Sequence, residues 1–81
     1  MSNNSMYRFL IIIEKGKRNY SAYAPDLPGC VATGKTLEEV KANMQGAIAL
    51  HLEGMMEDHE PIPVPQTTAD YLDVPSPHSA A

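Results

Sequence analysis

Residues 20–40 read YSAYAPDLPGCVATGKTLEEV, and this stretch decides the fold. Residues 19–24 and 30–33 carry the tyrosines, valine and threonine that favour strands. Between these two strands lies PDLPG, residues 25–29. It predicts a rigid corner, because two prolines fix φ and Gly29 accepts φ above zero. The segment TLEE at residues 36–39 then signals the start of a helix.

Upstream, residues 7–14 (YRFLIIIE) predict a first strand, joined to residues 19–24 by the polar turn KGKR. Pairing Glu14 with Asn19 divides the hairpin into two faces. One face is wholly apolar, and we expect the helix to cover it. The other face carries Leu10, Ile12 and Tyr23, and we expect it to bind a second copy or another protein. The alternative is that the proline-rich C-terminal segment folds back over it.

Downstream, a helix is predicted over residues 36–56, with Thr36 as N-cap and Glu39 as its capping-box partner. Its apolar stripe comprises Leu37, Val40, Met44, Ala47, Ile48, His51 and Met55. Residues 61–65 (PIPVP) should be extended, and residues 68–74 predict a fourth, edge strand. The sequence thus predicts one α+β domain over residues 6–75, ordered β-β-β-α-β, with one helix on an antiparallel sheet. Residues 1–5 and 76–81 are expected to be flexible tails.

Composition limits the classes of function that fit. The chain has 81 residues and a net charge of −4, which suits a single small domain and not a stand-alone nucleic-acid binder. One cysteine excludes an intrachain disulfide and a multi-cysteine zinc site. The chain starts without a basic leader and contains no long apolar run, so we expect a cytoplasmic protein without membrane contact.

The corner and the helix start resemble a motif of the HicB family of antitoxins. The residues that carry the resemblance are Pro25, Asp26, Leu27, Pro28, Gly29, Cys30, Thr33, Gly34, Thr36 and Glu39. A Pro-x-Pro segment at residues 61–63 follows in the same order, so the resemblance covers roughly residues 6–75. It implies a partial RNase H-like fold with the same β-β-β-α-β order.

The resemblance also implies a function. Family members neutralise HicA, a small basic toxin with a double-stranded-RNA-binding fold that cleaves mRNA. We therefore expect a protein-binding antitoxin module that occludes such a toxin and also forms a homodimer or higher oligomer. Many relatives carry a C-terminal DNA-binding module, but seven residues follow Val74 here, so no direct DNA binding is expected. The alternative is an orphan interaction or adaptor domain that has no toxin.

A nuclease ranks third, and the chain is expected not to be an enzyme. RNase H-like nucleases place a metal-binding carboxylate in the middle of the first strand, whereas residues 7–13 contain no acid. Asp26 is expected to accept hydrogen bonds from nearby backbone N–H groups. Cys30 is expected to be a buried, inert thiol. The histidines at positions 51, 59 and 78 lack metal-ligand spacing, so no catalytic residue, metal or cofactor is expected.

Overall fold

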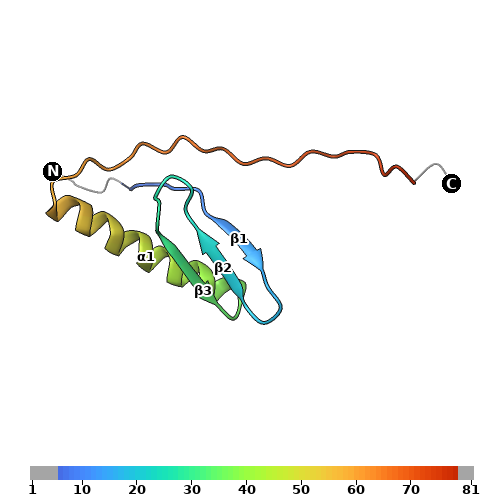
Figure 1. The fold of residues 1–81 in the computed structure, drawn as a ribbon, viewed down its shortest axis with the longest axis horizontal. Helices are drawn as coiled ribbons and strands as arrows, with labels where there is room; N and C mark the ends of the chain where they lie inside the picture. The colour runs from blue at the N-terminus through green and yellow to red at the C-terminus, as the bar shows by residue number, and fades with distance from the viewer. Residues whose placement is uncertain (1–5, 79–81) are drawn as a thin grey trace.

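The computed structural model describes residues 6–78 and contains three strands and one helix (Figure 1). The elements are β1 (Ile12–Lys15), β2 (Tyr20–Tyr23), β3 (Val31–Gly34) and α1 (Leu37–Glu57). The strands form one antiparallel sheet in the order β1-β2-β3. The helix lies across one face of this sheet, over β3 and β2. The predicted α+β class, with a helix on one face of an antiparallel sheet, is confirmed.

The hairpin between β1 and β2 has a different register from the predicted one. Lys15 pairs with Tyr20, and Ile12 pairs with Tyr23. The turn closes one residue later than expected, where the Gly16 N–H donates to the Asn19 carbonyl at 2.7 Å. The pairing is therefore shifted by two residues. Because side chains alternate between faces, an even shift leaves the predicted faces unchanged.

The first strand is shorter than predicted, since β1 begins at Ile12 and not at residue 7. β2 ends at Tyr23, and the corner that follows carries the chain away from the sheet. Pro25 also lacks the N–H that a further ladder bond would need. Residues 7–11 therefore have no neighbouring strand on that side and run as an irregular lead-in to β1.

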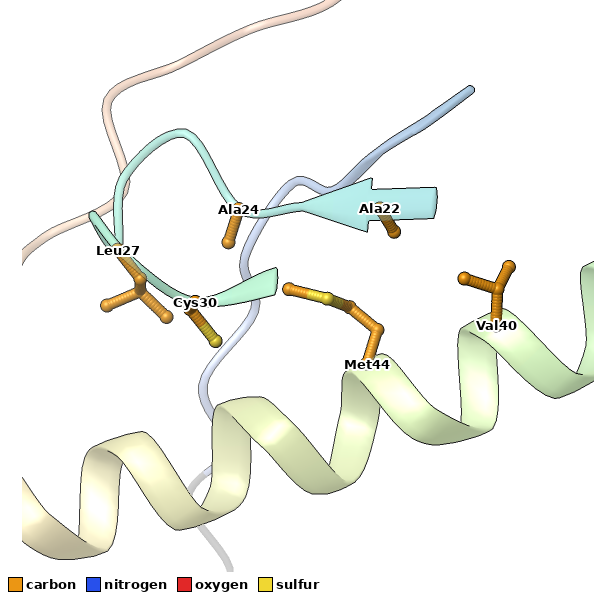
Figure 2. Close-up of a cluster of buried hydrophobic side chains, with 6 residues drawn as sticks. All are labelled: Ala22, Ala24, Leu27, Cys30, Val40 and Met44. Carbon is orange, nitrogen blue, oxygen red and sulfur yellow. The ribbon is translucent and has the colours of Figure 1, made fainter. Parts of the chain in front are cut away.

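The core lies between the helix and the inner face of the sheet (Figure 2). Val40 and Met44 point from α1 toward the sheet, and Leu27 enters from the corner. All three side chains are fully buried. The small residues Ala22 and Ala24 leave room for the helix to lie close to β2. The remaining core residue is Cys30.

The predicted helix stripe is correct at its centre and wrong at its start. Leu37 is exposed, because it occupies the first position of α1, at the edge of the sheet. Leu52, which was not predicted, packs against the core beside Ile48. The stripe therefore continues from Met44 along the helix, through residues spaced four apart.

The start of the helix is fixed by hydrogen bonds and by a close backbone contact. The Glu39 N–H donates to Thr36 Oγ1 at 3.0 Å, as predicted for the N-cap. The return bond of the capping box differs, because Glu39 Oε1 accepts from the N–H of Lys35 and not of Thr36. A Cβ at Gly34 would lie 2.5 Å from the Val40 nitrogen. Glycine therefore lets the end of β3 meet the first turn of α1.

The predicted fourth strand is not formed by the described residues. Residues 68–74 are extended but pair with no strand, since the chain leaves the sheet after Thr67 (Figure 1). We call residues 65–78 the C-terminal arm. It does not cover Tyr23, which remains 42% exposed, and its own residues are all exposed. The proline-rich segment reaches only the Leu10 end of the outer face, where Pro65 lines a groove with Leu10. A strand needs hydrogen bonds from a neighbour, and a sequence pattern alone supplies none.

Candidate protein-binding surfaces

The corner at residues 25–29 is held together by its own backbone. The Ala24 N–H donates to the Cys30 carbonyl at 3.2 Å. Two further bonds run from the Leu27 N–H to the Ala24 carbonyl and from the Cys30 N–H to the Leu27 carbonyl, at 3.0 and 3.1 Å. Gly29 has φ +84°, as predicted. This geometry turns the Leu27 side chain into the core and joins β2 to β3.

Asp26 ties the corner to the start of the arm. Its Oδ2 accepts from the N–H groups of Gln66 and Thr67 at 3.1 and 3.2 Å. Its Oδ1 accepts from the Thr67 hydroxyl at 2.9 Å. Desolvation disfavours the carboxylate, but these three bonds outweigh it and hold the pKa of Asp26 below its ordinary value. The prediction of local backbone donors is wrong, because the donors come from forty residues away.

Cys30 is buried in the core and has a free thiol. Burial raises the pKa of the Cys30 thiol, since the thiolate would lose its hydration. A buried thiol with a raised pKa remains protonated at neutral pH and is a poor nucleophile. Cys30 therefore acts as a small packing residue, as the sequence indicated.

The outer face of the sheet carries the residues that were predicted to bind a partner. Ile12 lies opposite Tyr23 in the register, and Leu10 precedes Ile12 on the same face. Leu10 and Ile12 are half-buried, and Tyr23 is 42% exposed. The helix lies on the other face and leaves Tyr23 accessible, whereas Leu10 is bordered by Pro65 and Thr67 across a groove.

Two apolar grooves flank the lead-in to β1. One, of about 340 Å³, lies between the lead-in and the helix and is lined by Phe9, Ile11, Met44 and Ile48 among others. The other, of about 460 Å³, lies between residues 8–11 and the start of the arm at Pro65, Thr67 and Thr68. The aromatic rings of Tyr7 and Phe9 are stacked, with centroids 6.4 Å apart. The lead-in thus offers apolar side chains on both of its sides.

A second exposed apolar surface lies where β3 meets the helix. Val31 is 64% exposed and Leu50 is 69% exposed, on either side of a shallow groove that Ala47 also lines. The sequence does not predict this surface as a whole, because nothing in it places Val31 beside Leu50. The available signal was that Leu50 falls outside the apolar stripe of the helix.

Groups that could perform chemistry are dispersed. Glu14 is exposed in β1, and Asp26 is engaged at the corner. His51 is half-buried on the helix, whereas His59 and His78 are exposed. Within residues 6–78, no three His, Cys, Asp or Glu side chains gather closely enough to hold a metal ion. No helix in this part of the chain is long and apolar enough to cross a membrane.

Several known proteins are similar to this chain. It is 42% identical over 65 residues to an uncharacterized 14.9 kDa protein from the rep-hol intergenic region of Haemophilus phage HP1, covering 80% of this chain. The match spans only 49% of that relative, so the chain corresponds to about half of its length. A UPF0150 protein from Synechocystis is 36% identical over 59 residues, covering 72% of this chain and 75% of the relative.

A solved structure and a family model agree with these matches. A chain of a HicA3 and HicB3 toxin-antitoxin complex superposes with a TM-score of 0.63 at 32% identity. The superposition covers 74% of this chain and 70% of the other. The model of the HicB_like antitoxin of bacterial toxin-antitoxin systems matches residues 9–80. The chain therefore belongs to the HicB-like antitoxin family.

Proposed function

We propose that this chain is a protein-binding antitoxin module that neutralises a small, basic, RNA-cleaving toxin of the HicA type by occluding it. The observation that carries the proposal is the match, in fold and sequence, to a chain of a solved toxin-antitoxin complex. The net charge of −4 supports it, because opposite charges speed the encounter with a basic partner.

The surface around Val31 and Leu50 is the one we propose for the toxin. In an α-helix, residues three and seven positions after Leu50 lie on the same side, and these are Glu53 and Glu57. All three residues are exposed. An apolar centre flanked by carboxylates has the chemistry to bind a basic surface that also carries apolar side chains.

Three further features belong to this proposal. The chain acts without catalysis of its own, in keeping with its membership of an antitoxin family. It also self-associates, because Leu10, Ile12 and Tyr23 form an apolar face that the helix does not cover. It functions in the cytoplasm, where a toxin that cleaves mRNA would act. The absence of direct DNA binding remains a prediction for these 81 residues.

The test is to isolate the tagged chain from its native cell and identify its partner by mass spectrometry. We expect a small basic protein that cleaves RNA when purified alone and stops cleaving when this chain is added. Leu50→Lys should weaken that inhibition at least about tenfold, which corresponds to 1.4 kcal/mol. Ala49→Lys, at an exposed position on another side of the helix, is the matched control. A partner without RNA-cleaving activity would instead favour the orphan adaptor.

A further inference from the structure

The C-terminal arm has the composition of a strand but lies away from the domain. Tyr71 is 95% exposed and Leu72 is 86% exposed, and Val74 is exposed as well. Figure 1 shows the arm running far beyond the sheet and the helix, and the molecule measures 61 × 28 × 23 Å. Its radius of gyration is 16.8 Å, against about 12 Å for a compact chain of this length. An exposed strand of this length normally finds a neighbouring strand.

The outer edge of β1 can supply that neighbour. In an antiparallel pair, only alternate residues bond to the partner strand. The bond between Gly16 and Asn19 sets this alternation, so Glu14 and Ile12 bond to β2. The backbone groups of Ile13 and Lys15 consequently point outward. No backbone hydrogen bond from elsewhere in residues 6–78 reaches them.

The opposite edge of the sheet is less available. The Ala24 N–H bonds to the Cys30 carbonyl, so the alternation on β3 turns Val31 and Thr33 outward. The side-chain amide of Asn43 donates to the Thr33 carbonyl at 2.8 Å. A strand that approached β3 would have to displace this bond. The edge of β1 is therefore the better acceptor.

The arm and this edge also match in length and in apolar character. Residues 68–74 and residues 9–15 are both seven residues long, which is about 23 Å of extended chain. Leu72 and Val74 lie on one face of such a strand, and Tyr71 lies on the other. The groove lined by Phe9, Ile11 and Ile48 borders the edge and can receive side chains from the inner face of an added strand.

We propose that residues 68–74 of one chain pair with residues 9–15 of a second copy, and that the second copy returns the same contact. This exchange rests on the self-association proposed above and assigns its contact to the arm and the edge of β1, next to the apolar face of Leu10, Ile12 and Tyr23. Asp26 favours exchange over pairing within one chain, because its bonds to Gln66 and Thr67 hold the start of the arm at the corner. From there the arm leads away from its own sheet (Figure 1). Each sheet then gains the fourth strand that the sequence predicts.

Light scattering at micromolar concentration tests the exchange with the full chain. We expect the wild type to have the mass of two chains, and Leu72→Lys to have the 8.8 kDa mass of one. Met56→Lys is the control, because Met56 is exposed in the helix, away from the arm. It should retain the mass of two chains. Circular dichroism should show the same helix content in all three proteins.

Amide hydrogen exchange, followed residue by residue, locates the contact. The amides of Ile13 and Lys15 should exchange at least about tenfold faster in Leu72→Lys than in the wild type. The amide of Glu14, which bonds to β2, should be slow in both and serves as the internal control. Together, the loss of dimer mass and of this protection would support the exchange.

Three outcomes would overturn it. A dimer that Leu72→Lys leaves intact, with unchanged exchange at Ile13, would show self-association through another surface. A wild-type monomer with fast exchange at Ile13 would refute both the exchange and the self-association. A wild-type monomer with slow exchange there would show that the arm pairs with its own sheet. None of these outcomes depends on whether the chain binds a toxin.

Discussion

The corner at residues 25–29 and the C-terminal arm both contain or border prolines, yet they reach opposite structural states. The corner is closed by backbone hydrogen bonds within seven residues and buries Leu27 completely. The arm is exposed along its whole described length. The comparison shows that a short turn can supply its own hydrogen-bond partners, whereas a strand must obtain them from another segment or another molecule.

The largest loss of stability should come from filling the space between α1 and the end of β3, the strand that follows the corner. Gly34→Ala would place a Cβ 2.5 Å from the Val40 nitrogen, which belongs to the backbone and cannot rotate away. We expect a loss of about 3 kcal/mol in the free energy of unfolding, at the upper end of overpacking costs. Denaturant unfolding measures it. Gly46→Ala is the control, because a Cβ there meets nothing within 4 Å, and it should stabilise the helix.

A smaller but still substantial loss should follow Gly29→Val in the corner itself. There is space for a side chain, but φ is +84°, which a β-branched residue adopts only with strain. We expect a cost of about 1–3 kcal/mol. Gly29→Asn should cost less, since asparagine tolerates this backbone region better than other residues do. A melting temperature equal to that of wild type for Gly29→Val would contradict the role of the corner.

Asp26→Asn tests the connection between the two regions, and we expect a smaller drop in melting temperature than for Gly29→Val. The amide oxygen can still accept one of the bonds from Gln66 and Thr67. The pKa of Asp26 is lower in the folded protein than in the unfolded chain. The carboxylate therefore stabilises the fold at any pH above the pKa that Asp26 has in the unfolded chain. That contribution is lost as the pH falls through the folded pKa.

Measuring both proteins across a range of pH is the control for the Asp26→Asn experiment, because it separates the effect of the charge from other effects of the substitution. The difference in melting temperature between wild type and Asp26→Asn should be largest at neutral pH and should shrink as the carboxylate becomes protonated. A difference that stays constant from neutral to strongly acidic pH would show that the charge of Asp26 does not stabilise the fold.

The smallest effect on the isolated domain should come from the arm. Leu72 is exposed in the single chain, so Leu72→Lys should change the free energy of unfolding by less than about 0.5 kcal/mol when the protein is monomeric. Thermal melts at a dilution where the wild type is monomeric measure this change. A larger destabilisation there would mean that the arm packs on its own domain.

The predictable parts of the fold are those that neighbouring residues determine. The N-cap at Thr36 and the positive φ of Gly29 follow from residue type and spacing alone. Other features depend on segments that meet only after folding. The partners of Asp26 lie forty residues away in the sequence. The first strand begins only at Ile12, because its neighbour β2 ends at the corner. The exposed surface at Val31 and Leu50 likewise arises where a strand and a helix happen to meet.

The bond from Asn43 to the Thr33 carbonyl has a consequence for solubility. A sheet with two receptive edges can recruit strands on both sides and grow into a fibre. Here a helix side chain occupies a carbonyl that a foreign strand would need on one side. Growth in that direction should be impeded, and the exchange proposed above, which uses β1 alone, would close upon itself. We therefore expect this one asparagine to limit edge-to-edge association of the sheet on the β3 side.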